Sequence, residues 1–132
     1  MNRKWVVLVL FVIGATIFTS QGLKGGPEVT VQEAVALLNT TPRPVLIDVR
    51  ERAVYEQGHI AGAISVPSAE FKERLEQLKL SKVDPIVVYG TDDVRVREAT
   101  KQLYQSGHQG ALTLMGGFDA WRAAGQPVTK KP

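Results

Sequence analysis

The residues best placed for chemistry lie in one loop, within the segment Ile86–Thr100, which reads IVVYGTDDVRVREAT. A short apolar run is followed by a polar loop and then by a charged stretch of helical character. A strand-to-helix turn of this kind is where α/β proteins commonly bind anions or place reactive groups. The groups that could act there are the Thr91 hydroxyl, the carboxylates of Asp92 and Asp93, and the Arg95 guanidinium.

These loop residues favour structural roles over catalysis. A hydroxyl nucleophile at Thr91 needs an adjacent base, and aspartates are weak bases unless they are buried. Asp92 or Asp93 is expected to cap the following helix with a side-chain oxygen. Arg95 could face an oxyanion, but a loop arginine paired with a carboxylate is the favoured interpretation. Gly90, which opens the loop, offers no reactive group.

The sequence has no cysteine and only two histidines. It therefore has no disulfide, no thiolate nucleophile and no cysteine-ligated metal. His59 and His108 lie far apart in the chain and make a poor metal set. No metal and no cofactor are expected.

The charge balance gives no sign of nucleic-acid binding. Sixteen Lys and Arg residues against 13 Asp and Glu give a net charge of +3, and Arg3 and Lys4 contribute two of these charges. No dense basic face is evident, and Lys130 and Lys131 form only a short basic tail.

After Gly25-Gly26-Pro27, short apolar runs alternate with amphipathic stretches, which predicts an α/β domain around a mainly parallel sheet. Thr30 and Glu33 form a capping box for a helix that ends before Pro42. Ser68 is expected to cap another helix, with Phe71, Leu75 and Leu78 on one face. The other expected helices are Arg52–Gln57, Arg95–Ser106 and Phe118–Ala124, and the expected strands are Val45–Val49, Ala63–Val66, Ile86–Tyr89 and Ala111–Met115.

Three segments in this order resemble the rhodanese (sulfurtransferase) family. They are LIDVRE at Leu46–Glu51 with GHIAGAISVP at Gly58–Pro67, IVVYGTDDVRV at Ile86–Val96, and LMGGFDAWRAAGQPV at Leu114–Val128. The resemblance covers residues 28–128. It implies a three-layer rhodanese-like fold in which the central, mainly parallel sheet is flanked by helices.

The resemblance also implies a catalytic cysteine directly after the strand Ile86–Tyr89, where it would carry sulfur as a persulfide. Gly90 stands at that position. The anion-binding loop would be Gly90, Thr91, Asp92, Asp93, Val94 and Arg95, but its two aspartates oppose a bound anion. Asp48, Arg50 and His59 match family positions whose expected role is structural.

The first 22 residues are predicted to be a signal peptide or an N-terminal membrane anchor. Arg3 and Lys4 precede an uncharged apolar run, Trp5–Phe18. Fourteen helical residues span about 21 Å, less than the roughly 30 Å hydrocarbon core, but Trp5 could anchor an uncleaved segment. Residues 23–27 are the expected linker, residues 28–128 the domain and residues 129–132 a tail.

The sequence thus predicts an exported rhodanese-like domain, periplasmic, secreted or held at the membrane by its N-terminus. A non-catalytic binding or regulatory module is favoured, in which the loop 90–95 meets a protein partner. The alternative is an enzyme that retains oxyanion binding at this loop and uses a hydroxyl or a thiol supplied by a substrate or partner.

Overall fold

The computed structural model describes residues 27–132, and the predicted N-terminal segment lies outside the described residues. The strands are β1 (Glu28–Val29), β2 (Val45–Asp48), β3 (His59–Ile60), β4 (Ile64–Ser65), β5 (Ile86–Tyr89), β6 (Ala111–Leu114) and β7 (Val128–Thr129). The helices are α2 (Val31–Leu38), α3 (Arg52–Gln57), α4 (Phe71–Leu78), α5 (Asp93–Gln105) and α6 (Gly117–Ala123), with a 3-10 turn η1 (Ser68–Glu70) before α4.

Five strands form a parallel sheet in the order β1-β6-β5-β2-β4, which confirms the predicted fold class. β5 lies in the middle, paired in register with β2 so that Ile47 faces Val88 and Asp48 faces Tyr89. All four residues of β5 are buried, as expected for a central strand covered on both faces.

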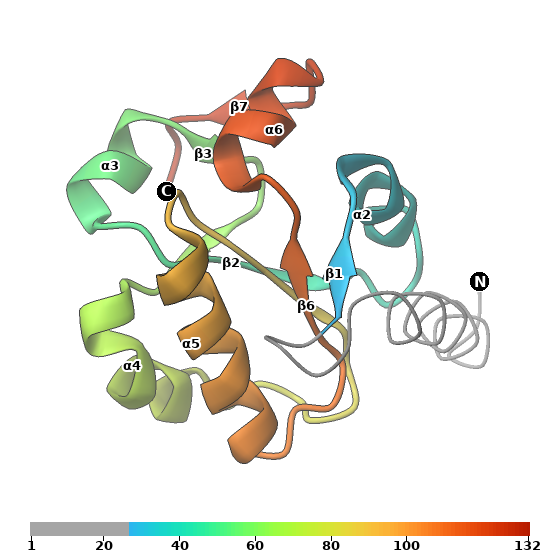
Figure 1. Ribbon diagram of the computed structural model, residues 1–132. Helices are drawn as coiled ribbons and strands as arrows, with labels where there is room; N and C mark the ends of the chain where they lie inside the picture. The colour runs from blue at the N-terminus through green and yellow to red at the C-terminus, as the bar shows by residue number, and fades with distance from the viewer. Residues whose placement is uncertain (1–26) are drawn as a thin grey trace.

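Helices cover the two faces of this sheet (Figure 1). On one face α4 and α5 pack with Phe71, Leu75, Val96 and Leu103 against Ile47 and Val88. On the other, α2, α3 and α6 pack with Leu37, Tyr55, Phe118 and Trp121 against Leu46 and Val87. Neighbouring strand residues therefore serve opposite cores, as the period of two in a strand requires.

Several predicted boundaries match the structure. The capping box of α2 is present, because the Glu33 amide donates to Thr30 Oγ1 and the Thr30 amide donates to Glu33 Oε1, both at 3.1 Å. α3 has the predicted bounds, Arg52–Gln57, and ends at Gly58.

Other boundaries were wrong. α5 begins at Asp93, two residues before the predicted Arg95, because Asp92 already supplies its cap. Ser68 does not cap a helix: it lies inside η1, and no side-chain hydrogen bond caps either η1 or α4. α6 begins at Gly117 and ends at Ala123, one residue earlier at each end than the predicted Phe118–Ala124, and Ala124 is its C-cap.

The predicted linker and tail both touch the fold. The carbonyl of Pro27 accepts a hydrogen bond from the Thr113 amide at 3.0 Å, so the chain is already joined to the sheet at this residue. Thr129, assigned to the tail, pairs with His59 in the antiparallel β3–β7 ribbon. Within residues 27–132, no helix is long and apolar enough to cross a bilayer.

Candidate functional site

A cavity of about 260 Å³ lies at the carboxyl edge of the sheet, where β2 and β5 end side by side. Ligands of parallel α/β proteins generally bind at this edge. One wall comes from the segment after β2 and the other from the loop after β5. The lining residues are Val49, Arg50, Glu51, Val54, Gly90, Thr91, Asp92 and Arg95.

Gly90 is buried at the end of β5, and its neighbours leave little room for a side chain. Strand alternation places residue 90 on the same face as Val88, toward α5. A Cβ atom at this position would lie 3.0 Å from a methyl carbon of Val49 and 3.0 Å from one of Val96. A side chain could enter only if these valines moved.

The start of α6 holds Gly90 from the opposite side. The Phe118 amide donates a hydrogen bond to the Gly90 carbonyl at 3.2 Å. Gly117 has φ +60°, and a Cβ there would lie 2.1 Å from the same carbonyl oxygen. The GGF sequence is therefore what allows α6 to approach the loop so closely.

Asp92 caps α5, as the sequence predicted for Asp92 or Asp93. Its Oδ1 accepts a hydrogen bond from the Val94 amide at 2.8 Å. Asp93 lies in the first turn of the helix, where its charge favours the positive end of the helix dipole. The protein's own carboxylates thus occupy the helix end that could otherwise hold an anion.

Arg95 lines the cavity and is exposed. Among residues 27–132 its guanidinium makes no ion pair, contrary to the favoured interpretation of a paired loop arginine. Arg50 is the other basic residue of the lining, but its charge is already engaged. Arg95 is therefore the cation of this cavity that remains available.

Asp48 and Arg50 form a buried ion pair below the cavity. Arg50 Nη2 lies 2.7 Å from Asp48 Oδ2 and 2.7 Å from the Gly58 carbonyl oxygen, to which it also donates. The guanidinium carbon lies 4.1 Å from the centre of the Phe118 ring. The pair therefore ties β2 to the end of α3 and to α6.

Ionisation is disfavoured for the tyrosine next to this pair. Burial raises the pKa of Tyr89 well above its usual range, and the charge of Asp48 raises it further. The neutral hydroxyl accepts a hydrogen bond from the Ile60 amide at 3.0 Å. Burial alone would lower the pKa of Arg50, but its hydrogen bonds and proximity to Asp48 outweigh this effect and raise it.

His59 lies outside the cavity lining. Its Nδ1 is 2.8 Å from the Tyr55 carbonyl oxygen, and its ring stacks on that of Tyr55 with centroids 3.6 Å apart. These contacts hold the turn between α3 and β3. Within the described part of the chain, no group of three or more His, Asp or Glu side chains could hold a metal ion.

The structure brings Gly90, Thr91, Asp92 and Arg95 together around the cavity, with Asp93 and Val94 in the first turn of α5 beside it. Sequence reasoning missed Val49, Glu51 and Val54 as lining residues. The available signal was that both LIDV and IVVY are apolar runs of a parallel sheet, so the residues after each run can meet at one edge.

The structure is an α/β domain with a central parallel sheet, in which the middle strand β5 runs through Gly90 into a turn and then into α5. A sequence model described as the rhodanese-like domain matches residues 30–124. The chain belongs to the rhodanese-like domain family, as a member without a cysteine.

Relatives differ in what is established for them. The chain is 37% identical over 76 residues to the uncharacterized protein YqhL of Bacillus subtilis, covering 58% of this chain and 59% of YqhL. It is 33% identical over 79 residues to the thiosulfate sulfurtransferase GlpE of Coxiella burnetii, covering 60% and 72%. The crystal structure of the Alr3790 protein from Anabaena superimposes with a TM-score of 0.72 at 31% identity, covering 78% of this chain and 82% of that one.

Proposed function

We propose that this protein is a rhodanese-like domain that binds a partner and does not itself transfer sulfur. Persulfide chemistry needs a thiolate to attack the sulfur donor and carry the sulfur atom. Gly90 stands where the resemblance places that cysteine. Methyl groups of Val49 and Val96 lie close to the position that a side chain at residue 90 would occupy. This packing around Gly90 is the observation that carries the proposal.

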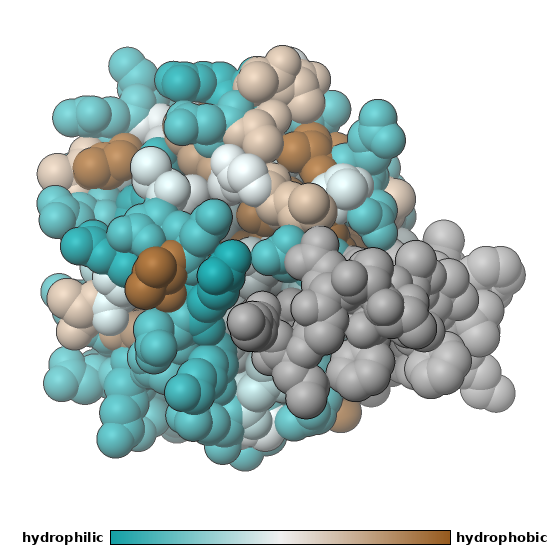
Figure 2. Space-filling view, viewed as in Figure 1, coloured by the Kyte–Doolittle hydropathy of each residue, from teal (hydrophilic) through white to brown (hydrophobic). Residues whose placement is uncertain are grey.

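The proposed binding surface consists of the exposed side chains of Glu51, Val54, Asp92, Asp93 and Val94, here called the loop surface. Two of its members are large hydrophobic residues, Val54 at 38% and Val94 at 67% exposure. The other three members, Glu51, Asp92 and Asp93, are exposed carboxylates. The face seen in Figure 2 is mainly hydrophilic, with hydrophobic residues in small separate groups. A partner that places an apolar side chain between basic residues fits this surface.

A sulfur-transfer assay tests the absence of activity. The full-length protein is incubated with thiosulfate and cyanide, and thiocyanate formation is compared with that of a rhodanese that has its cysteine. We expect the rate seen without protein, and no mass increase of one sulfur atom on the polypeptide. Turnover above that background would overturn the proposal.

A second variant asks whether the missing nucleophile is the only obstacle. Gly90→Cys alone would press its Cβ against Val49 and Val96, so the matched variant is Gly90→Cys with Val96→Ala. Transfer by this double variant would mean that the remaining scaffold is competent. Its inactivity would point to the carboxylates of Asp92 and Asp93.

Site-specific photocrosslinking tests the loop surface. A photoreactive residue replaces Val94, and the control replaces Val83, which is similarly exposed at 70% but lies outside the loop surface. We expect a discrete crosslinked partner from position 94 that disappears in an Asp92→Lys, Asp93→Lys background. Equal crosslinking from both positions, or none from position 94, would contradict a specific surface.

A second candidate function is oxyanion binding, as the basis of an enzyme that borrows a thiol or uses a hydroxyl. It is favoured by the unpaired guanidinium of Arg95 in the cavity lining. Calorimetric titration with thiosulfate, sulfite and phosphate tests it. Saturable binding that is lost in Arg95→Ala and kept in Arg97→Ala would support this function, since Arg97 is exposed on the same helix outside the lining.

We also propose that the domain works outside the cytoplasm, released or anchored by residues 1–22. The support is the order of Arg3 and Lys4 before the apolar run Trp5–Phe18. A β-lactamase fused after Pro132 should confer resistance if the domain is exported. N-terminal sequencing of the mature protein would distinguish a cleaved segment from an anchor.

A further inference from the structure

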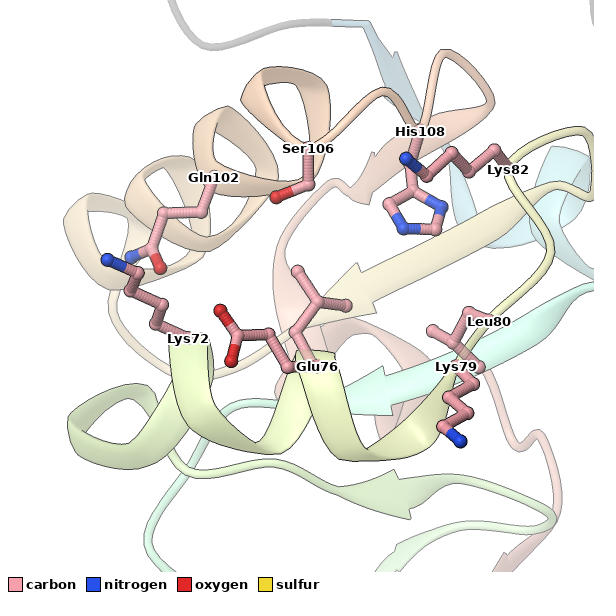
Figure 3. A pocket seen from close by; sticks show the side chains of 9 residues that line it. Lys72, Glu76, Lys79, Leu80, Lys82, Gln102, Ser106 and His108 are labelled. Carbon is pink, nitrogen blue, oxygen red and sulfur yellow. The ribbon is translucent and has the colours of Figure 1, made fainter.

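A second cavity, also of about 260 Å³, lies between α4 and the C-terminal part of α5 (Figure 3). It is at the opposite end of α5 from the loop surface. α4 and the segment after it contribute Lys72, Lys79 and Lys82, and α5 and its C-cap contribute Gln102 and Ser106. None of these residues is part of the three motifs that resemble the family.

The charges around this cavity are unbalanced. Three lysines line it against one carboxylate, Glu76. Within residues 27–132 neither these lysines nor Glu76 form an ion pair. Isolated surface lysines need no partner, but Lys72 and Lys82 extend along this concavity and create a positive potential that favours an anion, whereas the Lys79 side chain extends away from it in Figure 3.

His108 supplies an independent indication of a ligand. The residue is only 4% exposed, and its Nδ1 is a buried atom without a hydrogen-bond partner. Burial of such a polar atom without a partner is unfavourable. Figure 3 shows the imidazole reaching into the space between α4 and the turn after α5, with the Lys82 side chain beside it.

The lysine next to this imidazole is not needed to complete α5. The carbonyls of Gln102, Leu103 and Tyr104 already accept hydrogen bonds from the amides of Ser106, Gly107 and His108. The Lys82 side chain packs along Gly107, where a Cβ would lie 3.3 Å from Lys82 Cδ and 3.5 Å from its Nζ. Its ammonium group is therefore held near His108 and remains available to an anion.

We propose that this cavity binds a small phosphomonoester. A phosphate has two negative charges and three acceptor oxygens, which suit the lysine ammonium groups along the cavity, the Ser106 hydroxyl and the Gln102 amide. Neither of these two side chains makes a hydrogen bond within residues 27–132. The apolar walls formed by Leu75 and Leu80 fit the organic part of such a ligand. The inference is independent of the proposed function, which concerns the other cavity.

Nuclear magnetic resonance titration of the full-length protein with phenyl phosphate tests this assignment. We expect saturable shifts of the amide signals of Gln102, Ser106 and His108, and no comparable shifts at Gly90 and Arg95. Benzoate, which has the same ring and a single charge, should bind at least about tenfold more weakly. Shifts confined to Gly90–Arg95, shifts that do not saturate, or benzoate binding as tight as that of phenyl phosphate would overturn the assignment.

Two double variants separate this site from general charge attraction. Lys72→Gln with Lys82→Gln should weaken phenyl phosphate binding by about tenfold or more. Lys101→Gln with Lys131→Gln removes the same charge from exposed positions outside the cavity and should leave the affinity within about twofold. All four lysines are exposed, so neither variant should unfold the domain. Equal weakening in both variants would refute a built site.

Discussion

Two glycines meet at the end of β5, and each restricts what the other position can become. The Gly90 carbonyl accepts from the Phe118 amide, and Gly117 lies so close that its missing Cβ would overlap the same oxygen. Meanwhile the methyl groups of Val49 and Val96 border the space a side chain at position 90 would need. The absence of a nucleophile is therefore accompanied by packing suited to glycine.

This contact predicts a large cost for Gly117→Ala. The new methyl carbon would stand 2.1 Å from a backbone oxygen in a left-handed conformation, so α6 must move away. We expect a loss of about 4 kcal/mol or more in the free energy of unfolding, measured by urea denaturation. The control is Gly125→Ala, which has a similar φ of +72° but nothing within 4 Å and should cost about 1–2 kcal/mol. Equal losses of stability in the two variants would show that the cost comes from the positive φ alone and not from the contact with the Gly90 carbonyl.

The buried ion pair predicts a second difference at this scale. Asp48→Asn leaves the Arg50 guanidinium buried at 8% exposure without a counter-charge, which should cost about 3–5 kcal/mol. The matched control is Asp119→Asn, because the Asp119–Arg122 pair is exposed, at 3.4 Å, and should contribute less than about 1 kcal/mol. Chemical denaturation of both variants makes the comparison. A small loss in Asp48→Asn would mean that Gly58 and Phe118 suffice to hold Arg50.

At the scale of elements, local chemistry predicted most of what the structure contains. Thr30 with Glu33 specified the start of α2, and the apolar run Ile86–Tyr89 specified the central strand. The start of α5 was predicted too late because Asp92 and Asp93 were both assigned to the loop. An N-cap residue is followed directly by the first residue of its helix, so the cap at Asp92 places the start at Asp93. β1, β3 and β7 were missed because each has only two residues, too few to show a periodicity. These strands form only through pairing with distant parts of the chain.

The cap of α5 predicts unequal roles for its two aspartates. Asp92→Ala removes the acceptor of the Val94 amide and should cost about 1 kcal/mol, whereas Asp92→Asn keeps an acceptor and should cost less. Asp93→Ala, in the first turn without such a bond, should cost only a few tenths of a kcal/mol through the helix dipole. Thermal denaturation followed by circular dichroism checks this order. If Asp93→Ala lost more stability than Asp92→Ala, the capping residue would be Asp93 and not Asp92.

At the scale of the whole molecule, the sequence predicted one wall of the site, the loop after β5, but not the wall that follows β2. The loop after β5 could be found from its sequence, because the residues that form it are consecutive. Val49, Glu51 and Val54 were missed, because the two apolar runs indicate that the ends of two strands can meet but do not give the register that sets Asp48 beside Tyr89. The second cavity depends on how α4 packs beside α5, which no local pattern specifies.

The β3–β7 ribbon links the C-terminus to the site through a chain of contacts. β7 pairs Val128 with Ile60 and Thr129 with His59, and the Pro127 carbonyl accepts from Trp121 Nε1 and from the Ala61 amide. Beside this ribbon, the Gly58 carbonyl accepts from Arg50. The last strand therefore supports the turn on which the buried ion pair depends.

Truncation tests this dependence. A chain that ends at Pro127 loses β7 and leaves Ile60, which has no exposed surface, at an open edge. We expect a loss of about 1–3 kcal/mol in the free energy of unfolding and broadened amide signals at Gly58 and Arg50. A chain that ends at Thr129 removes only Lys130, Lys131 and Pro132 and should match the full protein. If both truncated chains were equally stable, the ribbon would not carry the end of the domain, and the fold would be complete at Pro127.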